Sequence, residues 1–181
     1  MSSEDLLGAI EHSTPAEWMR GAVAAMPIVE SVHVLAAVTV LGTLLIVDLR
    51  LLGLLELREA PRALTRVSRE LLPLAWLAFG AAVVTGSLMF STSAHSYFFN
   101  TAFRLKMLAL LCAGLNMAVF QLVTFRGVAS WDVNALPPRA ARVAGAVSLL
   151  LWASVVLLGR WIGFTKGYDF SIPDGVDLGF H

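Results

Sequence analysis

The chain has 181 residues, of which 57% are hydrophobic and only 14% are charged. Soluble domains carry about 25% charged residues, so this composition excludes an ordinary soluble domain and indicates a membrane protein in contact with the lipid bilayer. The formal net charge is zero, which gives no case for nucleic-acid binding. The single cysteine, Cys112, excludes a disulfide within the chain and a thiolate metal cluster.

Residues 1–26 predict an interfacial amphipathic segment that lies on the membrane surface and does not span it. Leu6 and Ile10 share one face of a first short helix, with acidic residues around it. Thr14 to Glu17 predict a capping box that begins a second short helix. The alternative is a partly ordered tail. The acidic start of the chain lacks the basic n-region of a cleavable signal peptide.

Four apolar segments are long enough to cross the hydrocarbon core of a bilayer, about 30 Å thick, as helices. The predicted spans are residues 28–49, 71–90, 103–125 and 143–162. Because the connections between them are short, the sequence predicts an all-α, up-down four-helix bundle over residues 27–165. Residues 166–181 are predicted to form an irregular tail.

Basic residues predict the orientation of the bundle. The side that holds the connections after the first and third spans carries eight of the thirteen basic residues, namely Arg50, Arg58, Arg62, Arg66, Arg69, Arg126, Arg139 and Arg142. The positive-inside rule places this side in the cytoplasm and both termini on the opposite, outer side. We therefore expect both termini to be outside the cytoplasm.

Ionisable residues gather at the outer end of the predicted bundle. Glu30 and His33 lie three residues apart in the first span and so share a helix face. Charged groups inside a membrane are costly and usually face protein or water, which makes this end the candidate site. Its members are Glu30 and His33 in the first span, His95 in the outer loop, Arg104 and Lys106 at the start of the third span, and Arg160 at the end of the fourth.

A series of short motifs runs through all four spans in a specific order. The most informative residues are Glu30, His33, Asp48, Leu49, Arg50, Thr85, Gly86, Lys106, Asn116, Gly159 and Arg160. Over roughly residues 26–165 this order resembles a family of small bacterial four-helix membrane proteins called domain of unknown function 6644. The resemblance implies the fold and a location in the bacterial inner membrane, but no reaction. With the orientation predicted above, both termini are then periplasmic. Members often carry a histidine near the end of the third span, where this chain has Gln121.

One hypothesis for the function is a membrane electron-transfer subunit that binds one b-type haem or a quinone. A four-helix bundle can hold haem between histidines on facing helices, which here would be His33 and His95. The basic residues of the cluster would then pair with the haem propionates. Without haem, His33 and Lys106 would donate hydrogen bonds to a quinone headgroup, and Glu30 would take protons.

A second hypothesis, which the sequence favours, is an accessory or structural subunit of a larger membrane complex, or a self-associating protein. Ion pairs and polar contacts inside a bundle can hold helix register without catalysing anything, and no complete catalytic constellation is present. The expected contacts are Glu30 with Lys106 or Arg160, Asp48 and Arg50 as caps of the inner end, and Asn116 in a hydrogen bond between helices.

Copper or small-solute handling is a minor third hypothesis. Met89 and Met107 fall near the outer end together with His33 and His95, and these are side chains that copper accepts. A di-iron site is excluded, because the second, third and fourth predicted spans contain no aspartate or glutamate.

Overall fold

The computed structural model describes residues 2–54, 63–124, 126 and 137–165. The predicted tail at residues 166–181 and the loop residues Arg58 and Arg62 lie outside these ranges. The described residues form helices and contain no strand, so the all-α prediction is confirmed. The elements are α1 (Ser3–Glu11), α2 (Thr14–Gly21), α3 (Ala25–Leu51), α4 (Ala63–Ser91), α5 (Ala94–Phe98), α6 (Thr101–Val119), the π-helix η1 (Phe120–Thr124) and α8 (Arg139–Thr165).

Four of these helices are long and apolar enough to cross a membrane, as the sequence predicted. The qualifying segments are Ala25–Leu51, Arg69–Ser91, Thr101–Val123 and Arg139–Thr165. Their outward-facing leucines, valines and isoleucines are exposed, which suits a surface in contact with lipid and not water. The chain is therefore a membrane protein built as a four-helix bundle.

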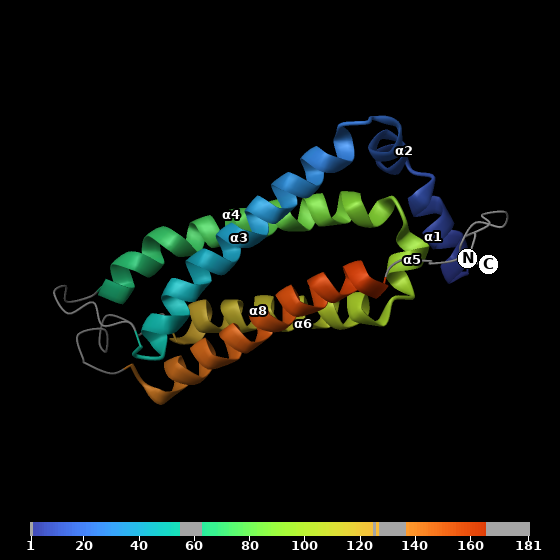
Figure 1. Cartoon of the computed structure of the whole chain (residues 1–181). Coiled ribbons are helices and arrows are strands. Elements are labelled where there is room, and N and C mark those ends of the chain that lie inside the picture. Colours follow the sequence, from blue (N-terminus) through green and yellow to red (C-terminus); the bar gives the residue numbers. More distant parts are fainter. Residues whose placement is uncertain (1, 55–62, 125, 127–136, 166–181) are drawn as a thin grey trace, which may run out of the picture.

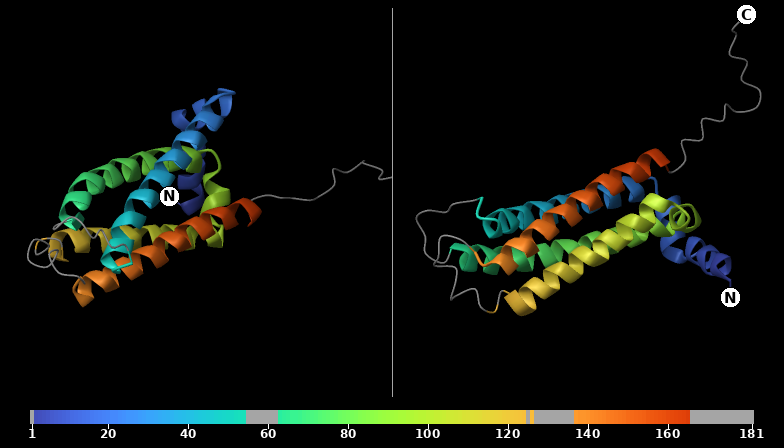
Figure 2. Two further views of the ribbon diagram at one scale, coloured as in Figure 1. Left: turned by 60° about the vertical axis from the view of Figure 1, so that its left-hand side comes forward. Right: turned by 90° about the horizontal axis from the view of Figure 1, so that it is seen from below.

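The bundle consists of two helix pairs that meet through one principal contact. Helix α3 packs along α4, and α6 packs along α8, while α3 also contacts α8 and so joins the pairs (Figure 1). The start of α3 and the end of α8 lie at the same end as α1, α2 and α5, which we call the outer end (Figure 2). The opposite end, where α3 ends and α8 begins, is called the inner end.

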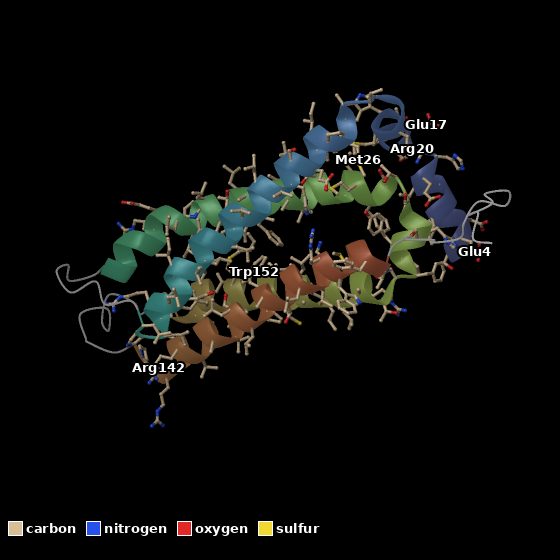
Figure 3. All side chains as sticks on the ribbon, in the orientation of Figure 1. Glu4, Glu17, Arg20, Met26, Arg142 and Trp152 are labelled. Carbon is tan, nitrogen blue, oxygen red and sulfur yellow. The ribbon has the colours of Figure 1, made fainter. Side chains whose placement is uncertain are left out.

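Trp152 of α8 stands at the centre of the main core (Figure 3). Its indole makes an edge-to-face contact with Phe79 of α4, with ring centroids 6.2 Å apart. Small side chains elsewhere in the core let the helices approach closely, as is usual for packing in membranes. The buried residues of this core are Val40, Leu44, Leu72, Ala75, Ala78, Ala113, Met117 and Trp152.

The two N-terminal helices begin with different caps. Helix α1 carries a capping box, in which the Ser2 hydroxyl accepts from the Asp5 amide and the Asp5 carboxylate accepts from the Ser2 amide. These hydrogen bonds lower the pKa of Asp5. The capping box predicted at Thr14 is wrong, because the N-cap of α2 is Ser13 and it makes no side-chain cap bond. The Ser13 hydroxyl instead donates to the carbonyl of Ile10.

Two hydrogen bonds tie the N-terminal helices to the outer end of the bundle, and a third joins these two helices to each other. Arg20 donates to the carbonyl of Thr92, 3.3 Å away, and also to the carbonyl of Glu11 (Figure 3). The Glu11 carboxylate accepts from the backbone amide of His95 at 2.9 Å. Helices α1, α2 and α5 thus form one structure, the outer cap.

Candidate functional site

His33 is held between α3 and α4 by a directed hydrogen bond. Its Nδ1 lies 3.0 Å from the hydroxyl oxygen of Thr85. That hydroxyl donates its only proton to the carbonyl of Ala81, at 2.7 Å. Since that hydroxyl already donates, Nδ1 of His33 is assigned as the donor to Thr85, and the imidazole also hydrogen-bonds to the backbone of Ala82. In a neutral ring of this tautomer Nε2 is an acceptor.

Gly86 gives the imidazole its place against α4. A Cβ at this position would lie 3.1 Å from Cε1 of His33, which is tighter than most such contacts, so a larger residue would push the ring outward by a few tenths of an ångström. Because Thr85 and Gly86 are adjacent, one turn of α4 supplies both the hydrogen bond and the space.

Lys106 brings a cation to the same region from the other helix pair. Its side chain crosses Gly159 of α8, and its Nζ would lie 3.6 Å from a Cβ at that glycine. The side chain is half-buried, and within the described residues its ammonium makes no ion pair and no hydrogen bond. The ammonium is also close enough to the imidazole of His33 for the two to interact electrostatically.

These residues lie at similar depths. His33, Thr85, Lys106 and Gly159 are each about 8–12 Å along their helices from the outer end, at a rise of about 1.5 Å per residue. The site therefore draws on all four long helices, because α3 supplies the imidazole, α4 its support, α6 the ammonium and α8 the surface under it. We call His33, Thr85, Gly86, Lys106 and Gly159 the outer site.

The other charged residues predicted at this end have exposed side chains, although the Glu30 carboxylate interacts electrostatically with the imidazole of His33. Glu30, Arg104 and Arg160 are exposed, and the guanidinium of Arg160 lies over the ring of Phe164, 5.9 Å from its centroid. Glu30 forms no ion pair with either Lys106 or Arg160 in the structure. A three-residue step turns a helix by about 300°, so Glu30 is offset by about 60° from the half-buried His33 and reaches the surface.

His95 is not brought to His33. Helix α4 ends at Ser91, and His95 lies on the separate helix α5, where its side chain is exposed. Its ring packs against Phe99 with centroids 4.8 Å apart, and its amide is bound by Glu11. The contacts of the two histidines thus belong to different parts of the outer end.

The remaining predicted polar residues lie toward the inner end. Asn116 of α6 donates through Nδ2 to the carbonyl of Ala144 on α8, at 3.2 Å. Asp48 is buried and hydrogen-bonds to Ser148 of α8, while Arg50 is half-buried two residues further on.

A groove of about 600 Å³ opens at the outer end between α5, α6 and α8. Neither His33 nor Lys106 lines it, and two of its polar groups bond each other, since Asn100 donates to the Thr165 hydroxyl at 2.9 Å. The groove is also widely open, so it lacks the convergent polar groups of a ligand site. Among the described residues, no three His, Cys, Asp or Glu side chains converge as a metal site, and Cys112 is exposed.

Comparison with known proteins returned one match. The model of a family of unknown function (DUF6644) matches residues 17–165, which includes all four long helices. No curated protein and no solved structure matches the chain.

Proposed function

This chain belongs to the family of unknown function DUF6644, and from that premise we propose that it is a membrane-embedded binding subunit for a carbonyl-bearing ligand, a quinone headgroup being the best fit. The ligand occupies the outer site between His33 and Lys106. Electron transfer through a bound quinone then takes place with a partner that supplies or accepts the electrons.

The half-buried Lys106 ammonium carries this proposal. A cation taken into a membrane protein is costly unless an acceptor compensates it, and no carboxylate among the described residues does so. A quinone carbonyl supplies the missing acceptor. The Nε2 lone pair of His33 accepts a hydrogen bond from the hydroxyl of the reduced quinol, so the pair can hold both redox forms.

The positions of His95 and Glu30 argue against a haem held by two histidines and against an ion pair between Glu30 and Lys106 at the outer end. A haem held by two histidines needs His95 opposite His33, and the contacts of His95 are with Glu11 and Phe99. An ion pair between Glu30 and Lys106 needs the carboxylate to turn inward, and Glu30 is exposed. A ligand that brings its own oxygen to Lys106 requires neither movement.

The proposal is tested by titrating the purified, detergent-solubilised protein with decylubiquinone or menadione. Binding is measured as quenching of the tryptophan fluorescence. We expect saturable quenching by the parent, and an affinity about 10–100-fold weaker for Lys106→Met, since a hydrogen bond to a charged group contributes about 1.5–3 kcal/mol. The matched control is Arg104→Met, which removes an exposed cation from the same helix and should bind like the parent. Equal affinities for Lys106→Met and the parent would contradict the proposal.

We also propose that the membrane is the bacterial inner membrane and that the outer end faces the periplasm. The arginines on the inner side support this orientation through the positive-inside rule. Tags at either terminus should be reached by protease added to spheroplasts. If the tags are protected until the membrane is broken, the orientation is reversed.

A second candidate function, an accessory subunit of a larger complex, is favoured by the outer cap. Its helices are held in place by Arg20 and Glu11, yet Trp18 and Leu6 on it remain about half exposed, at 55% and 48%. Such a surface suits either the membrane interface or a partner subunit. Purification in a mild detergent decides between these: a stoichiometric second protein supports the subunit role, and a lone chain argues against it.

A further inference from the structure

A second polar site lies near the inner end, on the opposite half of the bundle from the outer site. Asp48 of α3 is 4% exposed, and one of its carboxylate oxygens bonds to the hydroxyl of Ser148 on α8. The other oxygen, Oδ2, is fully buried and has no hydrogen-bonding partner among the described residues. Asp48 follows His33 by fifteen residues, about 22 Å along the helix, so the two sites are distinct.

A cavity of about 20 Å³ adjoins this carboxylate. Its polar lining comes from three helices, with Asp48 from α3, Asn116 from α6 and Ser148 from α8. Since the amide nitrogen of Asn116 is bound to the carbonyl of Ala144, the amide oxygen remains as an acceptor. The rest of the lining is apolar: Leu44, Val47, Leu51, Leu72, Met117, Phe120 and Ala144.

A close contact between α3 and α8 borders this cavity. A Cβ on Gly145 would lie 3.0 Å from Cβ of Leu51 and 3.2 Å from the carbonyl oxygen of Asp48. Helices α3 and α8 therefore approach each other closely here, one turn from Ser148.

We propose that this cavity binds one small monovalent cation, with Na⁺ as the fitting ion, held by the Asp48 carboxylate and by the oxygens of Ser148 and Asn116. Oxygen ligands that carry one negative charge are the ligand type that hard cations prefer. The charge balance favours a cation over water, because a carboxylate buried in the membrane must be neutralised and Asp48 makes no ion pair in the described structure.

The size of the cavity restricts the occupant further. A volume of about 20 Å³ holds one water-sized particle, which admits a dehydrated Na⁺ or Li⁺ but no organic cation. A proton on Oδ2 is the rival neutraliser. The dependence of stability on Na⁺ at fixed pH distinguishes this proton from a bound cation.

Thermal unfolding of the purified full chain in NaCl or choline chloride, at equal ionic strength and fixed pH, tests this site. We expect the Tm of the parent to rise by about 3 °C for each tenfold increase of NaCl above the dissociation constant, and to stay unchanged in choline chloride. Asp48→Asn, which keeps the shape of the side chain, should lose this dependence. The matched control is Glu30→Gln, which removes an exposed carboxylate from the same helix and should keep it.

The comparison of salts on the parent alone is sufficient to overturn the proposal. Equal Tm values in NaCl and choline chloride would leave water or a proton as the occupant. A Tm that changes with pH but not with Na⁺ would identify a protonated carboxyl. If Asp48→Asn fails to fold, Ser148→Ala retains the charge and should need about tenfold more NaCl for the same shift.

Discussion

Replacing Trp152 with alanine is expected to lower the free energy of unfolding by about 3–5 kcal/mol, the usual cost of removing a large aromatic side chain from a packed core. Trp152 is 7% exposed and packs at the centre of the main core, edge-to-face with Phe79. Between membrane helices this packing matters especially, because lipid is as apolar as the core and the hydrophobic effect adds little. Unfolding in mixed micelles with increasing SDS measures the loss.

Trp161→Ala is the matched control for Trp152→Ala. It removes the same side chain from the same helix, nine residues further on, where Trp161 is 61% exposed. We expect a change within about 0.5 kcal/mol, as for surface positions in general. Equal losses from the two variants would show that the centre of the bundle is not at Trp152.

Replacing Gly145 with leucine is expected to lower the free energy of unfolding by about 3 kcal/mol, at the upper end of the usual cost of overpacking. The new side chain would meet Cβ of Leu51 at 3.0 Å and the backbone oxygen of Asp48 at 3.2 Å, and a backbone atom cannot turn aside as a side-chain end can. The helices α3 and α8 must then separate. Since their contact joins the two helix pairs, we expect the whole bundle to loosen.

The same substitution at Gly163 provides the comparison for Gly145→Leu. Gly163 lies on the same helix and has no atom within 4 Å of its Cβ position. Leucine is also a better helix former than glycine, so Gly163→Leu should be neutral or slightly stabilising. The same unfolding assay reports both variants, and a loss at Gly163 as large as that at Gly145 would contradict the close approach of α3 and α8.

The outer site was predictable from the sequence only in part. His33 and Lys106 were identified because an ionisable residue inside an apolar span can be recognised from the sequence alone. Thr85 and Gly159 were singled out only as motif residues of the family resemblance and were given no role at the site, because their role depends on a neighbour on another helix. The exposure of Glu30 was not predicted for a similar reason. Residues three apart on a helix point in directions about 60° apart, and here that difference separates the half-buried His33 from the exposed Glu30.

The sequence by itself determined that this is a helical membrane protein and where its four long helices run. Whether a helix can span a bilayer depends on its own length and apolar composition, which are local properties of the sequence. Only the tertiary structure decided which polar groups meet. Asp48 and Ser148 are one hundred residues apart in the chain, and their contact depends on how α3 rotates and slides against α8. That arrangement depends on positions where glycine allows two helix backbones to approach closely, as at Gly145. Close packing of this kind is a property of a pair of helices and not of a single segment.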